Sequence, residues 1–159
     1  MPVEMKARCL IFDPSSNRFV VVLSDLKDER LLPIWIGPFE ANVIALKLKN
    51  VHTHRPVTHD LIRNILGLFN SQIMKIEVMD LKDNTYYALI HLNSQGKQIT
   101  IDSRPSDAIA VALGAGAPIF VTDDVLSKAK TIELDKNLEE DQLKEWLESL
   151  NPEDFKYKA

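Results

Sequence analysis

Residues 99–113, ITIDSRPSDAIAVAL, constrain the fold of this chain more than any other stretch. The first residues alternate between apolar and polar side chains, which predicts a half-buried strand. Pro105 predicts a sharp corner that opens a helix, because proline is favoured at the first helical position. Ser106 and Asp107 fall in the first helical turn, where hydroxyl and carboxylate groups bond free backbone N–H groups. Residues 108–113 are apolar on every side, so we expect this helix to be buried.

The rest of the chain predicts an α+β fold, with a mostly antiparallel sheet and short buried helices. Turn residues separate the β-rich runs, so neighbouring runs are expected to pair as hairpins and a meander. Pro33 indicates that its strand lies at a sheet edge or a bulge. The expected strands are 5–12, 18–23, 31–36, 73–81, 85–92, 99–101 and 119–122. Two further helices are expected. Helix 39–48 has a broad buried face, and helix 58–69 has Thr58 as its N-cap and an apolar stripe.

Two segments share the same order of strand, proline-containing corner and helix. Ile34 precedes Ile44 by the spacing at which Ile99 precedes Ile109. This match suggests an internal duplication, in which two α+β halves share one core. We expect residues 1–130 to form one domain, because a chain of 159 residues can build a substantial core.

Residues 131–159 are expected to form a separate acidic tail. Eleven of the 23 acidic residues fall within residues 123–159, against six of the 19 Lys and Arg residues. Apolar side chains recur there at i, i+3, i+4 and i+7, which predicts a C-terminal amphipathic helix. Such a helix can dock on the body of the protein, bind a partner or mediate self-association. The apolar positions are Leu143, Trp146, Leu147 and Leu150.

The charge balance narrows the classes of partner. Without residues 123–159, the body carries a net charge of only +1, from 13 basic and 12 acidic residues. Composition therefore gives no support for tight binding to phosphate backbones, although it does not exclude a locally basic groove. Cys9 is the only cysteine, which excludes an intramolecular disulfide and favours a reducing, cytoplasmic location. No apolar run approaches the roughly 20 residues that span a bilayer, so no membrane partner is expected.

Residues 52–60 contain three histidines, which can belong to a functional site or have only structural roles. Thr58, His59 and Asp60 offer a base with an orienting acid, or simply the capped start of a helix. His52 and His54 lie just before them, and imidazole groups bind zinc. Their spacing matches no standard zinc motif, and exposed loop histidines are the simpler interpretation.

A second set of candidates consists of carboxylates and arginines near helix starts. Clustered carboxylates bind Mg²⁺ or Mn²⁺, and such ions often assist phosphodiester hydrolysis. Arginine forks bind a phosphate, or a neighbouring carboxylate across a corner. Alternatively, the acids only cap their own helices. The candidate metal ligands are Glu40, Asp60, Asp102 and Asp107, and the candidate phosphate-binding residues are Arg55 and Arg104.

Several motifs agree in order and spacing with one known family. They are LPIWIG at 32–37 followed by Glu40, RPVTHDL at 55–61, IDSRPSDAIA at 101–110 and API at 117–119. This pattern resembles the bifunctional nuclease domain family, formerly a domain of unknown function, over roughly residues 5–130. The resemblance implies an oligomeric α+β domain that acts as a nuclease on DNA and RNA.

Taken together, the motifs favour a metal-assisted nuclease that hydrolyses phosphodiester bonds of nucleic acid. The expected catalytic residues are His59, Asp60, Asp102 and Asp107; the expected substrate-binding residues are Arg55, Arg104 and Ser106; the expected ligands of Mg²⁺ or Mn²⁺ are Glu40, Asp60, Asp102 and Asp107. The alternative hypothesis is a non-catalytic, homo-oligomeric binding or regulatory module, in which the same motifs are only corners and helix caps.

Overall fold

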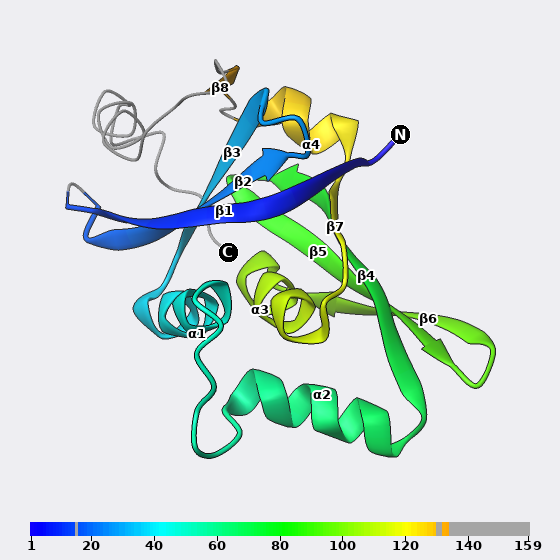
Figure 1. The fold of residues 1–159 in the computed structure, drawn as a ribbon. Coiled ribbons are helices and arrows are strands. Elements are labelled where there is room, and N and C mark those ends of the chain that lie inside the picture. Colours follow the sequence, from blue (N-terminus) through cyan, green and yellow to red (C-terminus); the bar gives the residue numbers. More distant parts are fainter. Residues whose placement is uncertain (15, 130–131, 134–159) are drawn as a thin grey trace.

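The computed structural model describes residues 1–14, 16–129 and 132–133. Its strands form a mixed sheet in the order β6-β5-β4-β7-β1-β2-β3-β8 (Figure 1). The strands are β1 Val3–Asp13, β2 Arg18–Asp25, β3 Arg30–Ile36, β4 Ser71–Lys82, β5 Thr85–Ser94, β6 Lys97–Ser103, β7 Ile119–Val121 and β8 Ile132–Glu133. The helices are α1 Pro38–Leu48, α2 Thr58–Leu68, α3 Pro105–Ala115 and α4 Asp123–Lys128. The predicted C-terminal helix lies outside the described residues.

The sheet consists of two three-stranded meanders, each followed by a helix. Strands β1, β2 and β3 lead into α1, and strands β4, β5 and β6 lead into α3. Strand β7 joins the two meanders, because it pairs antiparallel with β1 and parallel with β4. This arrangement confirms the expected α+β class and the repeated order of strand, corner and helix.

Local sequence explains the tight connection between β4 and β5. Lys82 pairs with Thr85, which leaves a two-residue loop of Asp83 and Asn84. Both loop residues have positive φ, 51° and 59°. A two-residue hairpin loop of this kind requires left-handed backbone, and Asp and Asn tolerate that conformation better than most residues.

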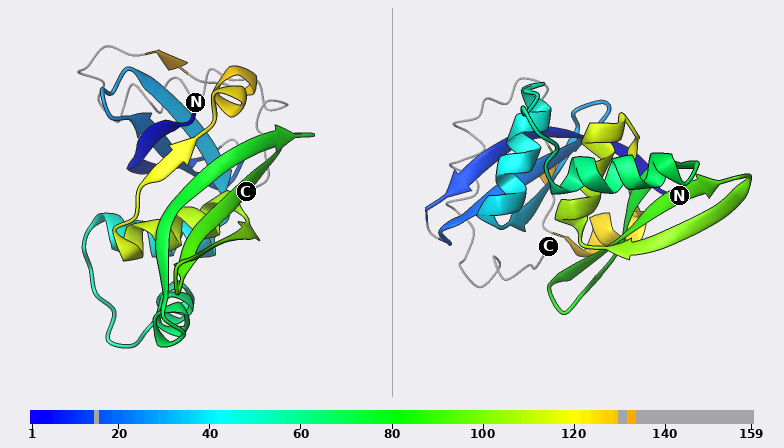
Figure 2. Two further views of the ribbon diagram at one scale, coloured as in Figure 1. Left: turned by 90° about the vertical axis from the view of Figure 1, so that its right-hand side faces the viewer. Right: turned by 90° about the horizontal axis from the view of Figure 1, so that it is seen from below.

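Helix α3 occupies the centre of the core. Residues 108–112 are buried, as the apolar run predicted, and α3 contacts both α1 and α2. Strands β4 and β5 curve past α3 toward α2 (Figure 2). The helix ends at Gly116, whose φ of 67° is the left-handed conformation of a glycine C-cap. Among the described helices, none is long and apolar enough to cross a membrane.

The third strand carries Pro33 near an open edge, as expected. Strand β2 pairs with β3 along most of its length, including Val22 with Pro33. On the other side, β8 pairs only with Arg30 and Leu31. Within the described residues, Pro33 therefore lies beyond the part of β3 that β8 pairs with, at a position near the sheet edge that tolerates proline.

Two sequence expectations about burial are wrong. Strand β6 was expected to be half-buried, but it lies at the edge of the sheet, and Ile99 and Ile101 are 40% and 41% exposed. Helix α1 has no broad buried face, because it buries only Ala41 and Ile44 and leaves Phe39 85% exposed. Helix α2 buries His59, and Leu66 of its apolar stripe packs partly buried against the core.

The expected cap of α2 is also wrong. The helix starts at Thr58 itself, and Val57 occupies the N-cap position without a side-chain cap bond. Instead, the carboxylate of Asp60 accepts a hydrogen bond from the backbone N–H of Val57, at 3.2 Å. Asp60 therefore satisfies one of the free N–H groups at this helix start.

Candidate functional site

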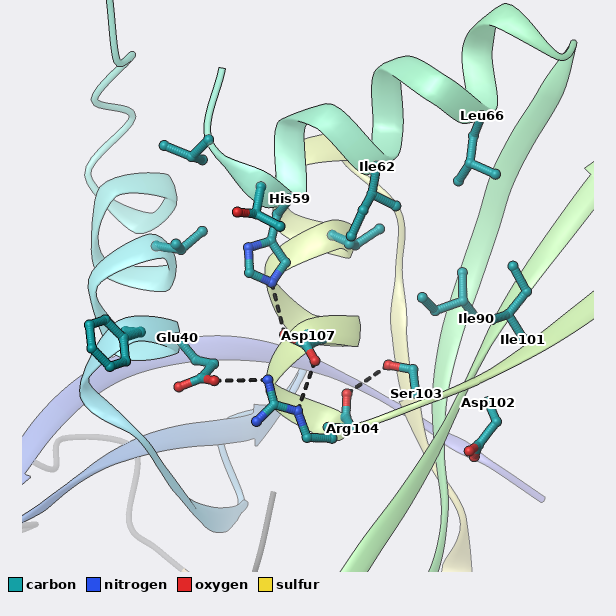
Figure 3. Close-up of a pocket in the computed structure, with 15 residues that line it drawn as sticks. Glu40, His59, Ile62, Leu66, Ile90, Ile101, Asp102, Ser103, Arg104 and Asp107 are labelled. Atoms are coloured by element: carbon teal, nitrogen blue, oxygen red, sulfur yellow. Dashed lines mark hydrogen bonds and ion pairs between the residues drawn. The ribbon is translucent and has the colours of Figure 1, made fainter. Parts of the chain in front are cut away.

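A pocket of about 590 Å³ lies between α1, α2, α3 and the ends of β5 and β6 (Figure 3). One wall is apolar and the other is polar. The apolar wall consists of Phe39, Val43, Val57, Ile62, Leu66, Ile90, Ile101 and Val111. The polar wall consists of Glu40, Thr58, His59, Asp102, Ser103, Arg104 and Asp107.

A chain of ion pairs and hydrogen bonds runs along the polar wall. The guanidinium of Arg104 donates from Nη2 to Oε1 of Glu40, at 2.8 Å, and from Nε to Oδ2 of Asp107, at 2.9 Å. The second carboxylate oxygen of Asp107, Oδ1, lies 2.9 Å from Nε2 of His59. Figure 3 shows these four side chains converging from three helices.

The convergence follows from where each residue sits in its helix. Glu40, His59 and Asp107 each fall in the first turn of α1, α2 or α3, and Arg104 is the residue that precedes α3. Acidic groups are stabilised at helix N-termini by the free N–H groups there. Three helix starts therefore meet at this site, and one arginine bridges two of their acids.

Electrostatics keep Asp107 ionised. Burial by itself would raise the pKa of its carboxyl, but hydrogen bonds from Arg104 and His59 outweigh burial and hold the pKa below its ordinary value. The same bond to Asp107 raises the pKa of Arg104 above its ordinary value, against the effect of burial and with help from Glu40. Both groups are thus charged near neutral pH, and Asp107 is a pure hydrogen-bond acceptor there.

The imidazole of His59 has one nitrogen in use and one without a partner. Nε2 faces Asp107, while Nδ1 is buried and makes no hydrogen bond to the described residues. A carboxylate partner requires the hydrogen on Nε2, so a neutral imidazole keeps a lone pair on Nδ1. A buried ring nitrogen of this kind can accept a proton.

The structure brings together four of the expected site residues: Glu40, His59, Arg104 and Asp107. Asp60 faces another pocket, of about 270 Å³, where its carboxylate binds Nζ of Lys47 at 2.5 Å. Asp102 borders the main pocket, but Figure 3 shows its carboxylate directed away from Asp107.

The remaining two expected site residues also lie apart from the polar wall. Arg55 is exposed in the loop between α1 and α2 and does not line the main pocket. Ser106 is fully buried, and its hydroxyl has no hydrogen-bond partner in the described part of the chain. Neither a cap role nor a substrate contact is therefore formed by this hydroxyl.

The carboxylates do not fit a divalent-metal site in this arrangement. No three or more His, Cys, Asp or Glu side chains are grouped for a metal ion within the described residues. Glu40 and Asp107 both bind the guanidinium of Arg104, so a cation would have to displace that positive group. The three histidines are also divided, because His52 and His54 line the smaller pocket and His59 the larger one.

Sequence reasoning missed two parts of the site. Lys47 is the partner of Asp60, and the only sequence signal was a basic residue in the last turn of the preceding helix. The apolar wall is the second part, because Ile62 and Leu66 were expected only as part of a helical stripe and Ile101 only as part of a half-buried strand. A period shows that side chains share a face, and it does not show what covers that face.

Comparisons with known proteins identify relatives of this chain. An uncharacterised Mycobacterium tuberculosis protein, Rv1829, is 37% identical over 163 residues, which cover 96% of this chain and 98% of that protein. Bifunctional nuclease 2 of Oryza sativa subsp. japonica is 28% identical over 96 residues, or 58% of this chain and 30% of the rice protein. Bifunctional nuclease 2 of Arabidopsis thaliana is 26% identical over 94 residues, or 57% and 29%.

The family model for the bifunctional nuclease domain matches residues 21–133. That range includes α1, α2 and α3 and therefore all four residues of the polar chain, Glu40, His59, Arg104 and Asp107. With most of its length matched, this chain belongs to the bifunctional nuclease domain family.

Proposed function

We propose that this chain is a nuclease that cleaves phosphodiester bonds of DNA and RNA at the pocket between α1, α2 and α3. One observation carries the proposal: His59 is bonded to Asp107, at 2.9 Å, on a pocket wall that also presents a partly exposed arginine. Membership of the family supports the same activity, because the rice and Arabidopsis relatives are named bifunctional nucleases.

His59 acts as the general acid and base in this proposal. Cleavage of a phosphodiester requires removal of a proton from the attacking oxygen and delivery of a proton to the leaving oxygen. Asp107 fixes the orientation of the imidazole and holds the hydrogen on Nε2, because its lowered pKa keeps a carboxylate 2.9 Å from that atom. When Nε2 donates to Asp107, the lone pair for this proton is on Nδ1, and because Nδ1 is buried the proposal requires a local opening at His59 when substrate binds.

Arg104 holds the phosphate. Its Nε and Nη2 atoms bind Asp107 and Glu40, which fixes the plane of the guanidinium. The side chain is 54% exposed, and its Nη1 atom takes part in neither ion pair. That atom can donate to a phosphate oxygen and stabilise the negative charge that develops during cleavage.

Participation of Mg²⁺ or Mn²⁺ stays a prediction. Because the donor arrangement does not fit an ion, we assign no step to one. Calorimetric titration with Mn²⁺ tests the prediction directly, with the wild-type chain and the Asp107→Asn variant side by side. Heat of binding that disappears in the variant would confirm a metal site at Asp107, and heat unchanged by the substitution would place any bound ion elsewhere.

The decisive experiment measures cleavage of defined DNA and RNA oligonucleotides by the purified chain. We expect His59→Ala and Asp107→Asn to lower the rate about a hundredfold or more, because each removes acid–base catalysis. His52→Ala is the matched control, since this histidine lies outside the main pocket. Thermal unfolding by circular dichroism verifies that the variants fold. Full activity in folded His59→Ala would refute the proposal.

A non-catalytic binding module is the competing proposal, and one observation favours it. Arg104 already neutralises Glu40 and Asp107, as a purely structural bridge between helix starts would. This alternative predicts nucleic-acid binding without cleavage, which the same oligonucleotides test by a mobility-shift assay. A cytoplasmic location and self-association are further proposals.

A further inference from the structure

The apolar wall of the main pocket includes a slot between a helix and the sheet. One side of the slot comes from α2, and the other side comes from β5 and β6. Figure 3 shows the side chains of the two sides pointing toward each other across the pocket. We call these four side chains the aliphatic slot: Ile62 and Leu66 on α2, Ile90 on β5 and Ile101 on β6.

The spacing of the residues explains both sides of the aliphatic slot. Ile90 and Ile101 are direct partners in the antiparallel pairing of β5 with β6, so their side chains are neighbours on one face of the sheet. Ile62 and Leu66 are four residues apart on α2, and residues with this spacing share one face of a helix. The slot is therefore a gap between a sheet face and a helix face.

The aliphatic slot lies beside the polar wall of the same pocket. His59 precedes Ile62 by three residues on α2, so the two side chains leave the helix on the same face. Arg104 follows Ile101 by three residues, just after the end of β6. A molecule that fills the slot and also binds Arg104 must therefore have an apolar part and an anionic part close together.

Solvent reaches the aliphatic slot from its open end. Ile62 is 36% exposed and Ile101 41%, whereas Ile90 is only 7% exposed. A ligand that fills the slot removes this apolar surface from water, which is favourable roughly in proportion to the area buried. The whole pocket, at about 590 Å³, is also within the range of roughly 300–1,000 Å³ that is usual for small-molecule sites.

We propose that the aliphatic slot holds one unpaired base of a single-stranded nucleic acid while Arg104 binds the adjoining phosphate. This inference rests on the proposed function and names the form of nucleic acid that the pocket takes. Each face of a base is a flat surface suited to stacking, and enzymes that extrude a base hold it between aromatic or apolar side chains. A nucleotide thus supplies both parts that the slot and Arg104 require.

The charge of the pocket disfavours a double helix as the ligand. Proteins that bind duplexes obtain much of their affinity from many phosphate contacts with Lys and Arg. Among the described residues that line this pocket, Arg104 is the one Lys or Arg. A site with a single phosphate contact needs affinity from the base, and a paired base is available only after a costly extrusion from the stack. A single strand avoids that cost.

The test is the binding of fluorescent oligonucleotides to the full chain, measured by fluorescence anisotropy. Three probes carry phosphorothioate linkages, which keep the negative charge and slow cleavage: a short single strand, the same strand in a duplex, and an abasic strand of equal length. We expect the single strand to bind about tenfold or more tightly than either of the others, because a buried base contributes on that order.

Two pairs of variants locate the base in the aliphatic slot. Ile101→Asn removes apolar surface without adding charge and should weaken binding of the single strand about fivefold, with the abasic strand unaffected. Ile99→Asn is the matched control, because Ile99 is 40% exposed on the same strand but outside the pocket. On α2, Ile62→Ala should likewise weaken binding, and Ile65→Ala, outside the pocket, should not. Circular dichroism verifies that each variant folds.

Three results would overturn the inference. The first is equal affinity for the single strand and the abasic strand, and the second is equal or tighter binding of the duplex. The third is wild-type affinity in both Ile101→Asn and Ile62→Ala. None of these results touches the proposed nuclease activity, which the cleavage assay measures separately. Conversely, base-dependent binding without cleavage would support the slot and refute the nuclease.

Discussion

Replacement of Arg104 by alanine removes the bridge between two helix starts and has a calculable cost. The arginine makes two charge-assisted hydrogen bonds, at 2.8 and 2.9 Å, to Glu40 and Asp107. Its side chain is 54% exposed, and solvent weakens exposed ion pairs, so we assign each bond about 0.5–1 kcal/mol of the free energy of unfolding. We expect Arg104→Ala to lower the free energy of unfolding by about 1–2 kcal/mol at pH 7.

The same change should alter how stability depends on pH. Arg104 and His59 lower the pKa of Asp107 in the folded state. Their contribution to the free energy of unfolding is therefore fully present above the pKa of Asp in the unfolded chain, about 3.9. It is lost as the pH falls through the lowered folded pKa, where the carboxyl becomes protonated. The difference in stability between wild type and variant should therefore be largest at neutral pH and shrink in acid.

Urea denaturation of both proteins, followed by circular dichroism across this pH range, gives the required free energies. Arg104→Lys serves as the control, because lysine keeps the charge but cannot bind both carboxylates through one planar fork. We expect it to recover only part of the loss. Two results would refute this account of the bridge. One is equal free energies of unfolding for wild type and Arg104→Ala at neutral pH. The other is a difference in free energy of unfolding that stays constant as the pH is lowered.

Three further substitutions test separate contacts by the same denaturation assay. Asp60→Ala should cost about 1–2 kcal/mol, because it removes a helix-start bond and leaves Lys47 without its carboxylate; an unchanged midpoint would contradict this. Ser106→Ala should be neutral or slightly stabilising, because the buried hydroxyl has no bonding partner to lose, and a large loss would show an undetected bond. Gly116→Ala should cost about 1 kcal/mol, because alanine is strained at a φ of 67°, and full stability would contradict the left-handed cap.

Hairpins and corners were predictable because their signals are local. Asp83 and Asn84 indicated a turn, and the structure places them in a two-residue loop. Pro105 indicated a helix start, and it is the first residue of α3. Strand β6 was misjudged because its alternation shows only that Ile99 and Ile101 share a face, and an edge position leaves that face in water.

The site was predictable in part, and helical geometry explains why His59 and Asp60 separate. Neighbouring residues on a helix point about 100° apart, so these two side chains leave the helix in different directions. His59 faces Asp107, and Asp60 faces Lys47. The pairing of His59 with Asp107 joins residues 48 apart in the chain, a contact that only the packing of α2 against α3 creates.

Strand geometry has the same effect on Asp102. Successive side chains on a strand alternate between the two faces of the sheet. Ile101 lines the pocket, so the carboxylate of Asp102 turns away from it (Figure 3). Although Asp102 borders the pocket, its carboxylate is therefore directed away from Asp107.

The short strand β7 has a consequence for how the molecule is assembled. Only three residues, Ile119–Val121, connect the two meanders, and the backbone N–H of Thr122 adds a bond to Val78 at 3.1 Å. During synthesis, both meanders leave the ribosome before this strand does, so each has an unpaired edge until residues 119–121 are available. Closure of the sheet is consequently a late, long-range step, and truncation before residue 119 would leave two unjoined halves exposed to aggregation.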